Sequence, residues 1–172
     1  SSCSILEKCD YIDPLDFQRE FSLELDSNSF VSFYFLNING FKTNFDEYVL
    51  NHISVSNLFD IICFSETNVD SDCIAQYGLG SDYHCLDIPK LPDKQKGSGL
   101  ALYYRKTLQL TLIDSLCNYG TSSRFQILGG KVKTECGFLH FLVVYRFHSC
   151  PVTEFCAELD TILNSITGPC VV

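Results

Sequence analysis

The sequence predicts an α/β fold in which β-sheets carry the core and helices cover them. Hydrophobic residues make up 46% of the 172 residues and charged residues only 19%, which excludes a globally disordered chain and suits a single domain. Apolar runs of strand length recur along the chain and are rich in aromatic and β-branched residues. Two other segments show helical periodicity instead. These patterns give the order strand, helix, strand, two hairpins, helix, strand.

The domain is expected to span residues 29–172, after an acidic tail at residues 1–28. Its first strand is predicted at SFVSFYFLNI, which begins at Ser29. The next segment, NFDEYVLNHISVSNLF, predicts a helix that Asn44 caps. The apolar face of this helix comprises Phe45, Tyr48, Val49 and Ile53. The run DIICFSE then predicts a second buried strand, so the domain opens with a strand–helix–strand unit.

The middle of the chain predicts loops and two hairpins. Residues 67–97 are polar and rich in turn residues, and they surround a short strand predicted at YHCLDI. The runs SGLALYYRK and LQLTLIDS are separated by a short polar turn, which predicts a first hairpin. The runs RFQILGGKVKT and GFLHFLVVYRF predict a second hairpin that turns at TECG.

The last predicted elements are a helix and a strand. Pro151 suits the first position of a helix that continues through PVTEFCAELDTILNSI. Its apolar stripe comprises Phe155, Leu159, Ile162, Leu163 and Ile166. The run GPCVV then predicts the start of another buried strand. No apolar run in the sequence is long enough to span a bilayer, so no membrane association is expected.

Charge and cysteine content limit the possible functions. The net charge of −9 makes the chain a poor non-specific binder of nucleic acid, so such a role requires a local basic patch or a divalent cation. Lys90, Lys94 and Lys96 form one basic cluster, which suits either a solvated loop or a contact with the DNA backbone. The ten cysteines include no CxxC pair, which disfavours a structural zinc site. We expect reduced cysteines in an intracellular protein, either nuclear or cytoplasmic.

Polar side chains follow three of the apolar strands. Asn37 and Asn39 end the first strand, Glu66 ends the second, and Tyr145 and Arg146 end the strand before the last helix. If these strand ends converge, Glu66 supplies the hard oxygen that Mg²⁺ prefers. Asparagine, tyrosine and arginine side chains can then hold a phosphate. This set predicts part of a phosphodiester hydrolase that lacks a clear general base.

Each of these residues also has a purely structural interpretation. The asparagines suit a turn at Gly40, because Asn and Gly both tolerate left-handed backbone conformations. Glu66 suits a solvated strand end, Tyr145 a core aromatic residue with a bonded hydroxyl, and Arg146 a surface charge. The residues alone leave both interpretations open.

The order and spacing of five motifs resemble one protein family. The motifs are LNINGF, DIICFSET, KGSGLALYY, LVVYRFHS and the helix that leads to GPCVV. Over about residues 30–172 they resemble the endonuclease domain of LINE-type (non-LTR) retrotransposons, within the endonuclease/exonuclease/phosphatase superfamily. The resemblance implies a DNase I-like sandwich of two sheets with outer helices. It also implies a Mg²⁺-dependent endonuclease that nicks DNA.

The resemblance assigns a role to each candidate residue. Asn37 matches an asparagine near the scissile phosphate, and Asn39 stands where relatives have Asp or Asn close to the metal. Glu66 matches the glutamate that binds the metal, and Tyr145 matches a tyrosine that contacts the phosphate. Arg146 falls where relatives often have arginine before Pro-Pro, which this sequence replaces with Phe-His.

Two motifs of that family are absent from the sequence. In relatives, a segment such as GPCVV leads into Gly-Asp-Phe-Asn, and a Ser-Asp-His segment follows later; neither occurs here. The resemblance therefore implies that the sequence holds about the first two-thirds of the fold, without its C-terminal third, and that this chain alone is inactive. The alternative is a truncated or domesticated, non-enzymatic module that binds protein and self-associates through an open sheet edge.

Overall fold

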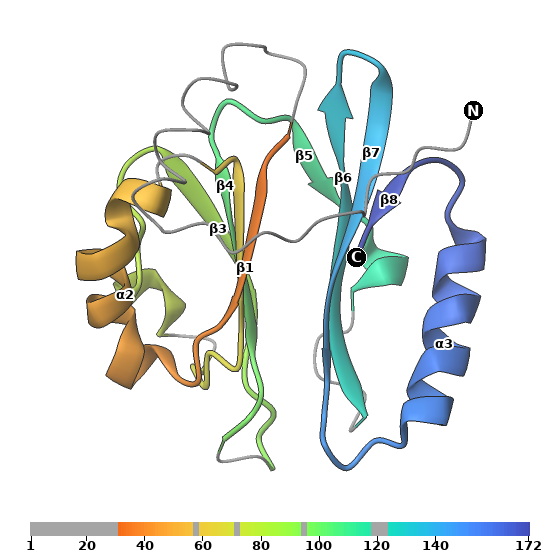
Figure 1. Cartoon of the computed structure of the whole chain (residues 1–172), viewed down its shortest axis with the longest axis horizontal. Coiled ribbons are helices and arrows are strands. Elements are labelled where there is room, and N and C mark those ends of the chain that lie inside the picture. The colour runs from red at the N-terminus through yellow and green to blue at the C-terminus, as the bar shows by residue number, and fades with distance from the viewer. Residues whose placement is uncertain (1–30, 57–58, 71–72, 94–95, 118–123) are drawn as a thin grey trace, which may run out of the picture.

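The chain folds into two four-stranded sheets that pack face to face, with a helix on the outer side of each sheet (Figure 1). The computed structural model describes residues 31–56, 59–70, 73–93, 96–117 and 124–172, and the side chains of residues 49–56 are not described. The predicted tail at residues 1–28 therefore lies outside the described part. The α/β class and the two-sheet sandwich with outer helices are confirmed.

The first sheet has the strand order β1-β2-β4-β3. The neighbours β1 and β2 run parallel, whereas β4 is antiparallel to both β2 and β3. The parallel pair is connected by helix α2, as the predicted strand–helix–strand unit requires. The strands are β1 (Phe33–Asn37), β2 (Ile61–Ser65), β3 (Tyr83–Ile88) and β4 (Leu100–Arg105).

The second sheet has the order β5-β6-β7-β8. The long hairpin of β6 and β7 confirms the second predicted hairpin, with Thr134 paired to Gly137 at its turn. The strand β8 adds to β7 in parallel. The strands are β5 (Leu110–Leu112), β6 (Phe125–Thr134), β7 (Gly137–Arg146) and β8 (Cys170–Val171).

The first predicted hairpin, between SGLALYYRK and LQLTLIDS, is wrong. The strand β4 pairs with β2 and β3 in the first sheet, while β5 pairs with β6 in the second. The chain instead crosses from one sheet to the other between them. This arrangement lets Leu102 of β4 and Leu110 of β5 pack into the same core between the sheets from opposite sides.

Helix α2 (Phe41–Ser56) covers the first sheet and α3 (Val152–Ser165) covers the second (Figure 1). As predicted, Phe45 and Tyr48 are buried against the first sheet, and the predicted apolar stripe of α3 packs on the second. Helix α2 begins earlier than predicted, so Asn44 does not cap it. Two short 3₁₀ helices, at Ile74–Gln76 and Asp114–Leu116, complete the described elements.

The amide of Asn44 explains this difference. It lies inside the first turn and donates from Nδ2 to the carbonyl oxygens of Ile38 (2.8 Å) and Asn39 (3.1 Å). The helix thus starts directly after Gly40, and Asn44 stabilises the turn before it. In the described part of the chain, no helix has the length and apolar character needed to cross a membrane. The described cysteines are free thiols.

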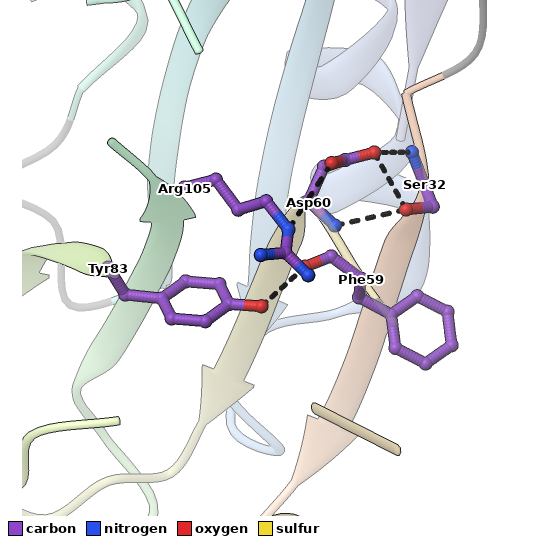
Figure 2. Close-up of polar contacts among 5 residues, drawn as sticks. All are labelled: Ser32, Phe59, Asp60, Tyr83 and Arg105. Carbon is purple, nitrogen blue, oxygen red and sulfur yellow. Dashed lines mark hydrogen bonds and ion pairs between the residues drawn. The ribbon is translucent and has the colours of Figure 1, made fainter. Parts of the chain in front are cut away.

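A polar cluster joins the strands of the first sheet at the end where β2 begins. Figure 2 shows that Asp60 Oδ2 accepts hydrogen bonds from the backbone nitrogen (2.9 Å) and hydroxyl (2.8 Å) of Ser32. The other oxygen, Oδ1, lies 3.6 Å from Arg105 Nε. The Arg105 guanidinium also stacks over the ring of Tyr83, whose hydroxyl donates to the Phe59 carbonyl at 2.6 Å. Asp60 therefore connects β1 and β4 through side-chain contacts.

We expect Asp60→Ala to lower the free energy of unfolding by about 2 kcal/mol, because hydrogen bonds to a charged acceptor contribute more than neutral ones. Solvent screening keeps the loss moderate, since the side chain is 24% exposed. Urea denaturation measures the effect. Asp160→Ala on the exposed face of α3 is the control, because Asp160 has no side-chain partner among the described residues. Equal stability of the two variants would show that the cluster adds nothing.

Two buried groups in the first sheet make stability sensitive to alkaline pH. Burial raises the pKa of the Cys63 thiol from 9.0 to about 12. Burial also raises the pKa of Tyr103, whose hydroxyl donates to the Tyr77 carbonyl. Both groups stay protonated in the folded chain above the pH at which they ionise in the unfolded chain. Their contribution to stability is therefore complete below pH 9 and is lost as pH rises through the folded pKa values.

The unfolding free energy is accordingly expected to fall steadily above pH 9. Cys63→Ala should reduce the slope of this decline between pH 9 and 12, because its thiol no longer titrates. Urea titrations across this pH range measure the slope. Cys156→Ala, at an exposed position of α3, is the control and should leave the slope unchanged.

Candidate active site

Three of the predicted site residues meet at one end of the sandwich. Asn37 ends β1 and Glu66 follows β2, and the parallel pairing of these strands brings both to the same edge of the first sheet. Asn37 Nδ2 donates to Glu66 Oε1 at 2.8 Å. Tyr145, near the end of β7 in the second sheet, donates from its hydroxyl to the same oxygen at 2.7 Å. The carboxylate of Glu66 therefore connects the two sheets.

The backbone around this carboxylate holds it in an unusual conformation. Asn39, Glu66 and Asn68 are the non-glycine residues with positive φ in the described chain, at 51°, 55° and 55°. Such conformations cost energy and persist only where surrounding contacts enforce them. Here the two turns hold each other, because the backbone nitrogens of Gly40 and Phe41 donate to the carbonyls of Glu66 (2.7 Å) and Thr67 (2.9 Å).

Asn37 is fixed at both ends of its amide. While Nδ2 donates to Glu66, Oδ1 accepts from the backbone nitrogen of Asn39 at 3.1 Å. The asparagines thus shape the turn before Gly40, as the structural interpretation of the sequence expected. Asn37 also donates to the Glu66 carboxylate. Its predicted contact with a phosphate stays a prediction.

The hydroxyl of Tyr145 is a hydrogen-bond donor. Burial and its hydrogen bond to the negative Glu66 raise the pKa of its hydroxyl well above 10.0. The hydroxyl therefore keeps its proton at neutral pH. The ring of Phe147 packs edge-on against the Tyr145 ring, with 5.6 Å between centroids. Phe147, the first residue of the Phe-His pair after Arg146, is buried. Its ring therefore packs against the Tyr145 ring from inside the protein.

Arg146 makes its hydrogen bonds elsewhere, and Asn39 contacts the cluster through its backbone nitrogen. Arg146 donates from Nη1 to the carbonyls of Cys150 (2.6 Å) and Phe147 (3.3 Å), and so braces the turn that leads into α3. Asn39 has an exposed side chain beside a polar pocket of about 370 Å³. Lys42 and Lys96 also line this pocket. The predicted catalytic role of Arg146 stays a prediction.

Solved structures share this arrangement of sheets and helices. The endonuclease domain of TRAS1, a telomere-specific non-LTR retrotransposon, matches with a TM-score of 0.56 and 10% identity, over 80% of this chain and 55% of that one. The AP endonuclease LMAP from Leishmania major gives 0.52 and 17%, over 82% and 48%. TDP2 from D. rerio, complexed with a single-strand DNA product, gives 0.55 and 12%, over 82% and 58%.

The same fold occurs in an endonuclease/exonuclease/phosphatase family protein from Leptotrichia buccalis, with a TM-score of 0.51 and 14% identity over 81% of this chain and 62% of that one. A retrotransposon endonuclease domain is among the structures that share it, as the motif order predicted. The chain spans about half the length of the solved structures above. No protein-family model and no curated protein matches the sequence. At these identities, the likeness establishes the fold.

The residues present at this site fit a divalent metal ion. Glu66 Oε2 accepts no hydrogen bond within the described part of the chain, because both donors go to Oε1. Mg²⁺ suits one or two carboxylates, with water and phosphate oxygens completing its shell. No group of three His, Cys, Asp or Glu side chains in the described ranges could form a closed metal cage. The site thus fits a metal ion that takes few protein ligands and keeps most of its bound water.

Residues 97–99, which were not predicted to belong to the site, form a loop that borders Glu66. A Cβ at Gly97 would lie 3.7 Å from the Tyr145 hydroxyl and 4.0 Å from Glu66 Oε2. Asn68, which was not singled out, accepts from the Ser98 nitrogen through its side chain at 3.3 Å. Gly99 in the KGSGLALYY motif lies close to Thr67, because a Cβ there would clash with the Thr67 hydroxyl oxygen. Only the tertiary contact shows which residues this loop approaches.

Proposed function

We propose that the chain carries part of the active site of a Mg²⁺-dependent endonuclease that nicks DNA. The observation that supports it is the cluster in which Asn37 and Tyr145 both donate to Glu66, across two sheets of an endonuclease-type fold. Glu66 Oε2 and the Asn39 amide are the groups that would hold the metal. The metal, when bound, would polarise the phosphate and stabilise the leaving oxygen.

The residues present are suited to binding more than to turnover. The Tyr145 hydroxyl stays protonated at neutral pH. To donate to a phosphate oxygen, its single O–H would turn away from Glu66 Oε1. Asn37 offers a neutral amide that does not repel an anion. Within the described residues, the hydrogen bonds of this cluster include no aspartate or histidine that could activate water. We infer slow cleavage or none, since loss of one catalytic partner costs orders of magnitude in rate.

DNA as the substrate has support from the fold and from local charge. D. rerio TDP2, which shares the fold, is a DNA complex. Lys42 and Lys96 place two cations beside Asn39, which offsets locally the net charge of −9. Two other lysines among the described residues make contacts elsewhere, and Lys94 of the predicted basic cluster lies outside the described residues. Lys90 pairs with Asp70 at 3.3 Å, and Lys131 stacks on Phe138 toward the other end of the β6–β7 hairpin.

A plasmid-nicking assay with Mg²⁺ tests the proposal. The unmodified chain and Glu66→Ala are compared by the fraction of supercoiled plasmid converted to the open circle. Glu154→Ala, an exposed carboxylate paired with Arg124, controls for the loss of a charge. Nicking that disappears only in Glu66→Ala would support an active site. Equal nicking by all three proteins would show contamination and contradict it.

If the unmodified chain does not nick, binding decides the question. The protein is titrated into a short fluorescent DNA duplex, and binding is measured by fluorescence anisotropy. Ca²⁺ replaces Mg²⁺, because it takes the same oxygen ligands and supports no turnover in this design. Weaker binding by Glu66→Ala than by Glu154→Ala would retain the site as a binding site. Identical binding would reject it.

A second candidate function is self-association through β1 and β8, which are edge strands of the two sheets in the described part of the chain. Phe35 of β1 is 55% exposed, and Val172 after β8 is 63% exposed. Both line an apolar groove of about 390 Å³ between the edge strands of the two sheets. Unpaired edges with apolar side chains can pair with a second copy of the chain. Light scattering measures the molar mass in solution. Phe35→Lys is expected to convert a dimer to a monomer. Val152→Lys, at an exposed position of α3, is the control and should leave the dimer intact.

A further inference from the structure

A buried glutamine connects the second sheet to the loop beside the candidate site. Gln126 of β6 has no exposed surface. Its Oε1 accepts from the Gly99 backbone nitrogen at 2.6 Å, and its Nε2 donates to the Pro89 carbonyl at 2.9 Å. One amide therefore holds both the segment that leaves β3 and the segment that enters β4.

Gln126 stands next to Tyr145 in the second sheet. The two residues are register partners across β6 and β7, so their side chains leave the same face of the sheet, toward the first sheet. Tyr145 contacts Glu66 directly. Gln126 contacts the loop that passes over Glu66. The two polar contacts from the second sheet thus act on neighbouring parts of the same site.

Hydrogen bonds of this loop connect Gln126 to the residues that directly follow Glu66. The Gly99 carbonyl accepts from the Thr67 nitrogen at 3.2 Å, and the Ser98 carbonyl accepts from the Asn68 nitrogen at 2.9 Å. These bonds hold the backbone directly after Glu66. At the other side of the loop, a Cβ added at Gly97 would lie 3.7 Å from the Tyr145 hydroxyl and 4.0 Å from Glu66 Oε2, so the Gly97 backbone borders both groups. The position of the loop therefore sets the space around the free carboxylate oxygen.

We propose that Gln126 is a positioning residue, which sets the geometry of Glu66 and Tyr145 through residues 97–99. This inference rests on the proposed function in taking Glu66 as the metal-binding carboxylate. The proposed action is not substrate contact, since Gln126 is fully buried. In this proposal, Gln126 fixes the position of Gly97 relative to Glu66 Oε2.

The chemistry of the position explains why an amide is needed there. Gly99 is buried, so its N–H needs a partner inside the protein. A glutamine supplies an acceptor to that N–H and a donor to the Pro89 carbonyl at once. An apolar residue of similar size would leave both backbone groups unsatisfied, and the loop would move to find other partners.

The test compares Gln126→Met with the unmodified chain, using Mn²⁺ as a paramagnetic probe. Methionine keeps the volume and removes both hydrogen bonds. We expect a 10- to 100-fold rise in the Mn²⁺ dissociation constant, the typical effect of losing a residue that orients a metal ligand. The backbone amide signals of Gly97 and Gly99 should also move in the metal-free protein. Gln76→Met, at an exposed position, is the matched control and should change neither readout.

A second variant, Gln126→Glu, is expected to make the Mn²⁺ affinity depend on pH. A purely structural role of Gln126 would not produce this dependence. In Gln126→Glu the carboxyl can donate to the Pro89 carbonyl only when protonated. Burial raises the pKa of such a carboxyl, so protonation begins near neutral pH. We expect the loss of Mn²⁺ affinity, relative to the unmodified chain at the same pH, to shrink as pH falls from about 8 to about 6. This variant decides the question if Gln126→Met does not fold.

The outcomes separate this inference from the proposed function. If the unmodified chain binds no Mn²⁺, the proposed metal site fails, and movement of the Gly97 amide signal in the Gln126 variants still tests the positioning role. Unchanged Gly97 and Gly99 signals with unchanged Mn²⁺ affinity would overturn the inference. An affinity loss in Gln126→Met that adds fully to that of Tyr145→Phe would also overturn it, because residues acting on one site are non-additive.

Discussion

Glu66→Gln is expected to weaken Mn²⁺ binding at least about 100-fold, because it replaces the one carboxylate of the cluster with a neutral amide. The substitution preserves shape, and the amide oxygen can still accept from Asn37 and Tyr145. The fold should therefore survive while the charge that attracts the cation disappears. A 100-fold change corresponds to about 2.8 kcal/mol of binding free energy.

The measurement is the Mn²⁺ dissociation constant from water-proton relaxation, with the melting temperature recorded on the same samples. Glu154→Gln is the matched control, because it makes the same change at an exposed ion pair on α3. The control should bind Mn²⁺ as the unmodified chain does. Retention of full Mn²⁺ affinity in Glu66→Gln would contradict the assignment of Glu66 as a metal ligand.

Gly99→Ala is expected to destabilise the fold by about 4 kcal/mol, from backbone strain and overpacking together. Gly99 has a φ of +95°, which residues with a Cβ adopt only at a cost. A Cβ there would also lie 2.3 Å from Thr67 Oγ1 and 3.3 Å from the Asn68 nitrogen. A loss of this size is a large fraction of the stability of a typical domain.

Urea denaturation followed by circular dichroism measures this loss. Gly78→Ala is the control, since a Cβ at Gly78 meets nothing within 4 Å and its φ is not positive. It should change stability by less than about 0.5 kcal/mol. The double variant Gly99→Ala with Thr67→Ala should recover part of the loss, because the nearest clashing atom is gone. A Gly99→Ala protein as stable as Gly78→Ala would show that the loop yields freely.

The hairpin of β6 and β7 and the misread β4–β5 pair show how far local pattern determines strand pairing. The sequence predicted both as hairpins from two apolar runs and a short turn. For β6 and β7 the ten-residue strands leave little alternative, and they do pair. For β4 and β5 the same pattern suits a crossing between sheets equally well. Both runs bury their leucines in the same core, so the spacing of apolar residues alone could not decide whether the two strands pair.

The site shows the same division between the two levels of structure. Asn37, Glu66 and Tyr145 could be singled out because polar groups at the ends of apolar strands are conspicuous in a sequence. Gln126 could not, because in the run RFQIL an isolated polar residue between apolar ones suggests a solvent-facing position. In the fold, β6 is covered on both faces, by α3 against Phe125 and Ile127 and by the first sheet against Leu128. The glutamine is therefore buried.

The sequence by itself determined the α/β class, most of the strands, both helices and the residues that could carry metal-dependent chemistry. It did so because apolar period, turn residues and polar strand ends are local properties of the chain. The tertiary structure decided which strands share a sheet, that Asn37 and Tyr145 meet on one oxygen of Glu66, and that Gln126 holds the loop above it. These contacts join residues 27 to 79 positions apart, and only the packing of the two sheets brings such distant residues together.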